Sequence, residues 1–485
     1  MKTTTTPIRR NTLAAAVLAA LLATTACGSS SDDAAPAAET VGDGSTTANA
    51  VFDATQVHTI EIEFDDADYQ ALLDAYSADG SKEWIEATVT IDGTTYTSAG
   101  IRLKGNSSLR RLGGGLGAEA GLAQGGSSDA PEELPWLIKL DKYVDDQAHD
   151  GVSDFVVRSN TSETALNEAV ALELLEAAGL ASQDAIAVRF SVNDSAEVLR
   201  LVIEHPDDVW MADNFDADGA LYKAESTGDY RYRGDDPDAY DDVFDQEAGK
   251  DNADLEPLIE FLDFINNADD DTFAAEIGDW LDVDSFATYL AMQEIVQNFD
   301  DIDGPGNNSY LYYDTETGQF TVVPWDHNLA FGDAGFGIGG GRVGSEEPGG
   351  FPPGAELPEG VEPTEGVELP ELPEGIEPGE LAEGVEPPTD VRPDRRPEGL
   401  GDQDGEGGPG GPGGRSNVLV ERMQALDEFS SLYEQRLAEL TTTLIDSGIA
   451  TDIVASWAAV LEEGASDLVA VDTIAAEAER LANSL

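Results

Sequence analysis

The stretch from Val322 to Gly332, "VVPWDHNLAFG", decides how this sequence is interpreted. A run of strand-forming apolar residues leads into one carboxylate, Asp326, and a glycine closes the apolar turn that follows. A carboxylate among buried apolar residues is costly unless a metal ion, a cation or backbone amides compensate it. The pattern therefore predicts a functional carboxylate at the end of a buried strand, or else a carboxylate that caps a neighbouring loop.

The surrounding sequence predicts mixed α and β structure. Period-two alternation in "HTIEIEF" and in "WIEATVTIDGTTYTSAGIRL" indicates strands, the second containing a hairpin turn. Residues 162–179 carry apolar residues at helical spacing behind a Ser cap and end at a glycine. Helical patterns dominate after residue 255, and "NNSYLYYDTETGQFTVVPWD" predicts two strands around a turn. We expect an α+β fold with a β-rich first lobe and a helical second lobe.

The composition is strongly acidic. Asp and Glu number 98 against 25 Lys and Arg, which gives a formal net charge of -73. A chain of this charge repels nucleic acid, so a phosphate-backbone binder is excluded as the simple interpretation. We interpret the charge as an adaptation for solubility, with the attraction of a basic polypeptide partner as the alternative.

Residues 1–27 have the pattern of an export signal. Basic residues precede an apolar run, 13–23, that is too short to span a bilayer, and Cys27 follows it. The stretch resembles a lipobox, except that Thr24 stands where Leu is usual. We expect lipidation of Cys27 and anchoring to the outer face of the bacterial cytoplasmic membrane, with residues 28–50 as a flexible tether; an ordinary secretory signal is the alternative.

Residues 336–416 differ in composition from the rest of the chain. They are mostly Gly, Pro and Glu and contain a degenerate repeat, "EGVEP", "EGVEL", "EGIEP", "EGVEP". Such a segment buries too little apolar surface to offset its ordering entropy, so we predict a disordered acidic insertion. Helical periodicity returns in residues 417–485, which we expect to complete the helical lobe.

Separated polar residues suggest phosphoryl transfer. That chemistry needs cations or amides on the phosphates, hard oxygen ligands on a metal ion, and an acid that positions the acceptor hydroxyl. We predict Asp326 as the main metal ligand and Asn308 as the second. Asp300, which follows a predicted helix, would orient or deprotonate the acceptor hydroxyl.

The predicted phosphate contacts come from the first half of the chain. Lys139, on the strand "LIKL", would contact the phosphates with Glu168 as its ionic partner. Lys104 and Lys223 are alternatives for the phosphate lysine. A loop over the nucleotide would contain Lys104, Asn106, Ser107 and Ser108.

Five motifs in this order resemble the spore-coat CotH kinase family. They are "IRLKGNSS", "VIEHPDDVWMADNF", "ALYKAES", "NFDDIDGPGNNSYLYYD" and "VVPWDHNLAFG", and the resemblance covers about residues 51–335 and 416–470. It implies an atypical, kinase-like two-lobed domain over residues 51–335 that uses ATP with Mg²⁺ or Mn²⁺. By this resemblance Asp300 matches the catalytic Asp, and Asp326 the metal-binding Asp of the family.

The sequence departs from the family pattern at several positions. The connection "DDIDGPGN" is longer than usual, so Asp301 or Asp303 is an alternative to Asp300. Asn328 stands where the family often has Asp. His327 is interpreted as a structural residue rather than a base.

Two functions of different class are consistent with these features. The first is an ATP-dependent, metal-requiring Ser/Thr protein kinase of the cell envelope, acting on secreted or surface proteins, with a basic and Ser-rich protein as the expected substrate. The second is a surface adhesion or interaction lipoprotein that uses a kinase-like scaffold. The retained Asp300, Asn308 and Asp326 favour the kinase.

Overall fold

The computed structural model describes residues 51–105, 107–109, 112, 127–225, 228–304, 308–332 and 417–485, which belong to one compact unit. The predicted signal peptide, tether and acidic insertion lie outside the described residues. So do Cys27, Asn106 and the side chain of Ser107, and their predicted roles stay predictions.

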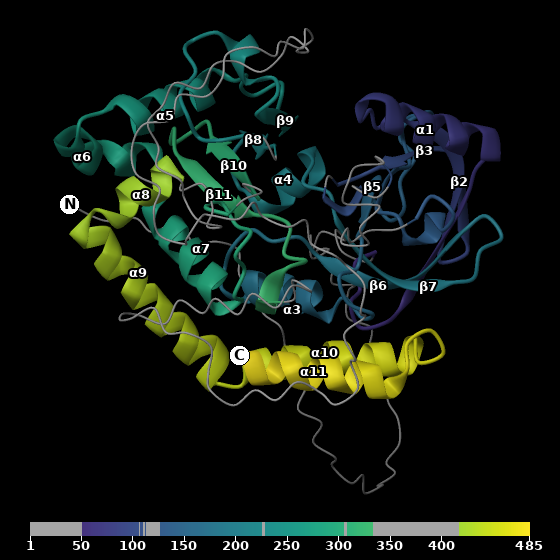
Figure 1. The fold of residues 1–485 in the computed structure, drawn as a ribbon. Helices are drawn as coiled ribbons and strands as arrows, with labels where there is room; N and C mark the ends of the chain where they lie inside the picture. The colour runs from purple at the N-terminus through teal and green to yellow at the C-terminus, as the bar shows by residue number, and fades with distance from the viewer. Residues whose placement is uncertain are drawn as a thin grey trace, which may run out of the picture. The chain divides into compact units, whose positions relative to one another are not determined.

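The first half of this unit contains a closed barrel of seven strands (Figure 1). The strands pair in the order β1-β2-β3-β4-β5-β7-β6, and the parallel pairing of β1 with β6 closes the ring. Alternating side chains of β1 fill the interior, because Ile60 and Ile62 are buried while the glutamates between and after them are exposed. The strands are β1 His58–Glu63, β2 Ile85–Ile91, β3 Thr94–Leu103, β4 Trp136–Lys139, β5 Asp154–Val157, β6 Ala185–Val192 and β7 Val198–Glu204.

Strand β5 is buried on both faces. Phe155 and Val157 pack inside the barrel, whereas Val156 packs outside it in the cluster that contains helix α3, Leu166–Ala177. The helix predicted over 162–179 is confirmed, but it begins later than expected and its first residues lack a side-chain cap. Ser162 instead accepts a hydrogen bond from the backbone amide of Ala165, at 3.1 Å.

A second sheet of four antiparallel strands follows in the order β11-β10-β8-β9. A short helix, α4, Asp208–Asn214, connects barrel strand β7 to β8. The strands are β8 Gly219–Ala224, β9 Phe244–Ala248, β10 Ser309–Asp314 and β11 Phe320–Pro324. The register pairs Ser309 with Pro324, so the start of β10 and the end of β11 lie at the same edge.

The remaining helices cover these sheets. Aspartate caps start three of them, since Asp65, Asp269 and Asp282 accept hydrogen bonds from backbone amides of α1, α6 and α7. Helices α10 and α11 contact α3, as Figure 1 shows. The helices are α1 Asp66–Asp79, α5 Glu256–Asn267, α6 Asp270–Trp280, α7 Val283–Ile295, α8 Val418–Gln424, α9 Asp427–Leu440, α10 Ile449–Gly464 and α11 Val471–Ser484. Within the described part of the chain, no single helix is long and apolar enough to cross a membrane, while the bent pair Asp427–Asp446 and Ile449–Gly464 meets the length and composition criteria jointly.

The predicted mixture of helices and strands is confirmed. The hairpin β2–β3 and the strand pair β10–β11 lie where the sequence placed them. Closure of the barrel was not predicted, and neither were β5, α4, β8 and β9. The second half thus contains helices and the predicted β10–β11 pair, which β8 and β9 extend to a sheet of four strands.

Candidate active site

Three predicted site residues meet at the edge formed by β10 and β11. Asn308 directly precedes β10 and Asp326 follows β11 by two residues, so the sheet register brings them to the same edge. The Asn308 side-chain amide donates to the backbone carbonyl of Asp300 at 2.9 Å, and its backbone amide donates to that of Asp301 at 3.2 Å. The loop bearing Asp300 is therefore fixed beside the predicted metal ligands.

The turn that carries Asp326 has an unusual backbone. Asp326 and Phe331 adopt left-handed conformations, with φ of 62° and 59°, which non-glycine residues rarely occupy. Contacts with Thr161 and with the start of α3 hold the turn, because the Asn328 carbonyl accepts hydrogen bonds from Thr161 Oγ1 at 2.8 Å and Asn167 Nδ2 at 2.6 Å. Such conformations persist only where the surroundings enforce them, and they gather at functional sites.

His327 connects this turn to the loop of Asp300. The buried imidazole lies 3.2 Å from the Gln293 side chain, which accepts a hydrogen bond from Asn298 Nδ2 at 2.9 Å. Asn298 in turn accepts from the backbone amide of Asp300 at 3.3 Å. Burial lowers the pKa of His327 to about 4, so the ring is neutral at physiological pH. These contacts agree with the structural role predicted for His327.

The cation beside Asp326 is Arg158, which follows β5. Its guanidinium pairs with Asp326 and also with Glu168 of α3, through Nη2 at 2.8 Å and Nε at 3.0 Å. Glu168 is only 2 % exposed, whereas the side chain of Asp326 is 30 % exposed. Burial raises the pKa of Glu168, and Arg158 offsets this in part. Asp326 is thus the solvent-facing member of a buried charge network.

The predicted ion pair between Lys139 and Glu168 was wrong. Lys139 lies directly opposite Asp154 in the β4–β5 register and binds its Oδ1 at 2.9 Å, with Asp141 at 3.1 Å. Cross-strand neighbours on one face are within reach of each other. Lys139 therefore pairs with Asp154 and not with Glu168 of the helix. Arg158, which the sequence analysis missed, is the partner of Glu168.

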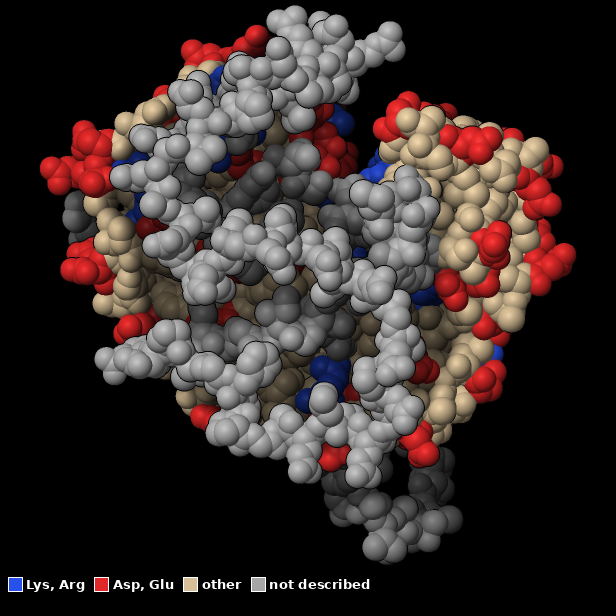
Figure 2. Space-filling view, viewed as in Figure 1, with Lys and Arg blue, Asp and Glu red and all other residues tan. Residues whose placement is uncertain are grey.

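Lys104 is the lysine that lies beside the candidate site. Its ammonium is 5.5 Å from the centre of the Trp325 ring and 2.9 Å from His205 Nε2. Burial lowers the pKa of Lys104 to about 7; the charge of Glu247 opposes this shift, and the charges of Lys223, Arg102 and Arg158 add to it. Figure 2 shows acidic side chains over much of the visible surface, with patches of Lys and Arg set in the hollow beside the barrel. A group of cations is thus concentrated here in a chain of net charge -73.

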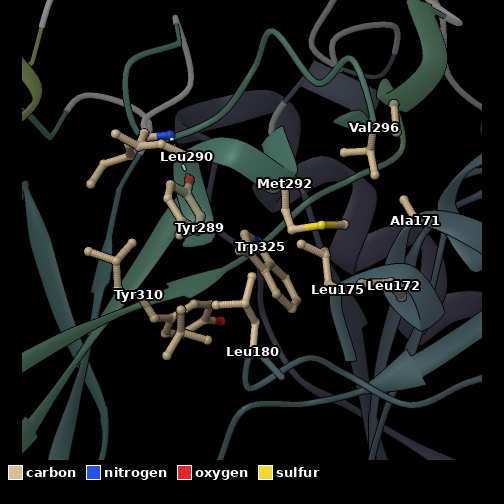
Figure 3. Packing of buried hydrophobic residues seen from close by; sticks show 14 of the residues in the cluster. Ala171, Leu172, Leu175, Leu180, Tyr289, Leu290, Met292, Val296, Tyr310 and Trp325 are labelled. Atoms are coloured by element: carbon tan, nitrogen blue, oxygen red, sulfur yellow. Dashed lines mark hydrogen bonds between the residues drawn. The ribbon is translucent and has the colours of Figure 1, made fainter. Parts of the chain in front are cut away.

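The Trp325 ring packs against Lys104 and Arg158. Its side chain is 5 % exposed and packs among Met292, Leu175 and Leu180, as Figure 3 shows. The ring of Tyr310 meets it edge-on, with centroids 5.3 Å apart. The indole therefore forms a rigid apolar floor, over which Lys104 and Arg158 lie.

The predicted loop over the nucleotide begins with a glycine that the backbone requires. Gly105 has a φ of 104°, and a Cβ there would lie 2.4 Å from Ser108 Oγ. Ser108 thus packs against the backbone that follows Lys104. Tight glycine turns of this kind allow backbone groups to approach a ligand closely.

These residues fit a nucleotide with a divalent metal ion. Asp326 and Asn308 offer the hard oxygen ligands that Mg²⁺ and Mn²⁺ accept, and the neighbouring cations suit phosphate groups.

A cavity of about 470 Å³ lies elsewhere, between α1 and residues 127–129, and its described lining contains none of the predicted site residues. A sequence signal that could have identified Arg158 is its position. It is one of only 25 basic residues, and it directly follows the apolar run "FVV".

Comparison with known proteins shows the family to which the chain belongs. A family model described as "CotH kinase protein" matches residues 101–474. "Inner spore coat protein H" from Bacillus subtilis (strain 168) is 26 % identical over 168 residues, which cover 34 % of this chain and 45 % of the relative. The matched region thus spans less than half of that relative's length. On the family match, which covers most of the sequence and every described site residue, the chain belongs to the CotH family.

Proposed function

We propose that this protein is an ATP-dependent, metal-requiring atypical kinase that transfers a phosphoryl group to Ser or Thr of secreted or surface proteins. The observation that carries the proposal is the burial of Lys104 and Arg158 over Trp325, next to Asp326. Arg158 is compensated by Glu168 and Asp326, whereas Lys104 contacts the His205 and Trp325 rings, and a buried cation without an anion is costly. A nucleotide triphosphate supplies that charge.

The charge network supports a kinase-like site. In protein kinases a strand cation pairs with a glutamate on a neighbouring helix, and the pair orients the phosphates. Arg158 after β5 and Glu168 on α3 form a pair of this type. We assign Lys104 to the phosphates. Lys139 is less suitable, because its ammonium is already paired with the carboxylates of Asp141 and Asp154.

Asp326 and Asn308 would hold the metal ion. Asp326 Oδ1 pairs with Arg158, and its second oxygen together with the Asn308 side-chain carbonyl provides two hard ligands. The bound Mg²⁺ or Mn²⁺ would neutralise charge that develops on the phosphates. Arg158 holds the carboxylate of Asp326 in place at the same edge.

Asp300 would orient the acceptor hydroxyl and take up its proton. Asp303 Oδ1 accepts from the Asn417 amide at 2.5 Å, and Asp301 Oδ1 accepts from the Asp303 amide at 3.0 Å. Burial also raises the pKa of Asp301 to about 6. Asp300 remains the residue that we assign to this role, and the Asn308 bond to its carbonyl positions its backbone.

The cellular setting is part of the proposal. Export and a lipid anchor at Cys27 would place the kinase on the outer face of the membrane, as predicted from residues 1–27. A basic, Ser-rich protein is the expected substrate, because a chain of net charge -73 attracts basic polypeptides.

The test is transfer of labelled phosphate from ATP to a basic, Ser-rich acceptor, with Mg²⁺ or Mn²⁺ and the purified full-length chain. We expect metal-dependent labelling that Asp326→Ala abolishes. Asp300→Ala should lower transfer by about 10²–10⁴-fold while nucleotide binding persists, which is the effect expected for loss of a general base. No labelling, together with no thermal shift for any nucleotide and metal, would overturn the kinase proposal and favour adhesion.

A further inference from the structure

Three side chains outside the candidate active site converge near the junction of the barrel and the second sheet. One ligand atom from each of Asp154, His205 and Asp207 lies within 4.8 Å of the other two. Asp154 is the first residue of β5, His205 directly follows β7, and Asp207 is the N-cap of α4. We propose that these three residues bind a divalent transition-metal ion, separate from the metal at Asp326 and Asn308.

Each carboxylate has one oxygen left for an ion. Asp154 Oδ1 accepts from Lys139 Nζ at 2.9 Å and from Ser153 Oγ at 2.8 Å, and its Oδ2 lies 3.7 Å from His205 Nδ1. Asp207 Oδ1 accepts from the first backbone amides of α4, two bonds of 2.9 Å each. The hydrogen bonds of both carboxylates thus involve Oδ1, and Oδ2 of each can coordinate an ion.

His205 provides the observation that points to a ligand. The residue is 8 % exposed, and Nε2 lies 2.9 Å from Lys104 Nζ. A metal ion on Nδ1 requires the tautomer whose ring proton is on Nε2, and in that tautomer Nε2 donates to the amine of Lys104. Nδ1 is buried and has no hydrogen-bond partner among the described residues, since 3.7 Å to Asp154 is too long for a hydrogen bond. A buried polar atom without a partner is destabilising, and a metal ion on Nδ1 would remove that cost.

The cavity between these side chains has room for one ion or one water molecule. A cavity of about 20 Å³ is lined by the three residues and also by Glu204 and Asp213. This volume holds a single ion or water molecule and excludes an organic ligand. Burial raises the pKa of Glu204 well above its usual value, so Asp213 is the further carboxylate that adds negative charge around the cavity. Lys139 and Lys104 bond to the other atoms of Asp154 and His205 and do not line the cavity.

The donor set selects the kind of ion. One imidazole nitrogen with two carboxylate oxygens suits Zn²⁺ and its first-row neighbours, whereas Mg²⁺ prefers oxygen ligands alone. Ligand atoms around tetrahedral Zn²⁺ are about 3.3 Å apart. The separation of 3.7 Å between His205 Nδ1 and Asp154 Oδ2 is close to this value, so modest closure of the side chains suffices. A water molecule would complete the coordination.

Such an ion would connect three parts of the chain that are distant in sequence. It would tie β5 and the end of β7 to α4, the connection to the second sheet. Through the His205 ring it would also fix the position that faces Lys104. We therefore expect the ion to stabilise the fold and to order the wall of the candidate nucleotide site.

The test is Zn²⁺ binding by the metal-stripped full-length chain, measured by calorimetry, with Co²⁺ absorption reporting nitrogen and oxygen ligation. We expect one equivalent to bind and the melting temperature to rise. Asp207→Asn is the key variant, because Asn caps helices as well as Asp but lacks the carboxylate. It should weaken Zn²⁺ binding by at least about tenfold, and His205→Gln should do the same.

Two controls separate this site from other metal binding. His149→Gln removes a histidine that bonds to Tyr96 instead, and Asp326→Ala removes the other proposed metal ligand; both should retain Zn²⁺ affinity. The proposal is overturned if the wild-type chain binds no stoichiometric Zn²⁺ or if Asp207→Asn binds it as tightly as the wild type. If His205→Gln fails to fold, Asp207→Asn decides the question alone.

Discussion

Replacement of Arg158 by Met should destabilise the protein strongly. Arg158 binds Glu168 through two nitrogens at 2.8 and 3.0 Å, and Glu168 is 2 % exposed, so the substitution leaves a buried carboxylate without its cation. Removing one partner of a buried ion pair costs about 3–5 kcal/mol of unfolding free energy. The loss should be smaller at pH 5 than at pH 8, because burial already raises the pKa of Glu168 and protonation would relieve the stranded charge.

The assay is urea unfolding followed by tryptophan fluorescence and circular dichroism. The matched control is Arg231→Met, which breaks a pair with Asp229; the Arg231 side chain is 71 % exposed, so the change should cost under about 1 kcal/mol. The double variant Arg158→Met/Glu168→Gln should regain most of the lost stability, because it removes the stranded charge. A cost below about 1 kcal/mol for Arg158→Met, or a double variant no more stable than the single one, would refute the assignment of a buried charge network.

Three further predictions concern single residues. Lys104→Met should weaken ATP binding by roughly 10–100-fold, the loss of one charge-assisted hydrogen bond, while the exposed Lys250→Met should leave it unchanged; calorimetric titration measures both. Gly105→Ala should lower the unfolding free energy by about 1 kcal/mol or more, measured by urea unfolding, because its φ of 104° strains any residue with a Cβ. Burial raises the pKa of Glu173, so protonated Glu173 stabilises the folded state at low pH and that stability is lost as pH rises through the folded pKa. Glu173→Gln keeps the bond from Trp457 and should therefore raise the melting temperature at pH 7.5 but leave it unchanged at pH 4.

The elements that were predicted correctly are those whose signal is local. The "IDGTTY" turn specifies the β2–β3 hairpin, and "DTETGQ" specifies the β10–β11 pair, because turn chemistry and alternation both act over a few residues. Barrel closure is different, since it depends on parallel pairing of β1 with β6, about 130 residues apart. No periodicity within either strand encodes that partner. Strand β5 was missed because four residues buried on both faces show no alternation.

The candidate site shows the same division between local and distant information. Asp326, Asn308 and Asp300 were found because each stands at the end of a predicted element, and the register of β10 with β11 places the first two at one edge. Charge pairing was predicted poorly. The sequence analysis paired Lys139 with Glu168, but the strand register places Lys139 opposite Asp154, and the ion pair of Glu168 is with Arg158.

The net charge explains why the cations of the site are buried rather than exposed. At physiological ionic strength, charges more than about 8 Å apart are largely screened, so the acidic surface neither prevents nor assists anion binding at a distance. A solvated lysine among 98 acidic residues would pair with a neighbouring carboxylate, as Lys139 does with Asp154. Lys104 differs from Lys139, because its Nζ contacts the Trp325 ring and the neutral His205 ring. Apolar and neutral neighbours thus keep Lys104 available for an anion, whereas Arg158, over the same Trp325 ring, is already paired with Asp326 and Glu168.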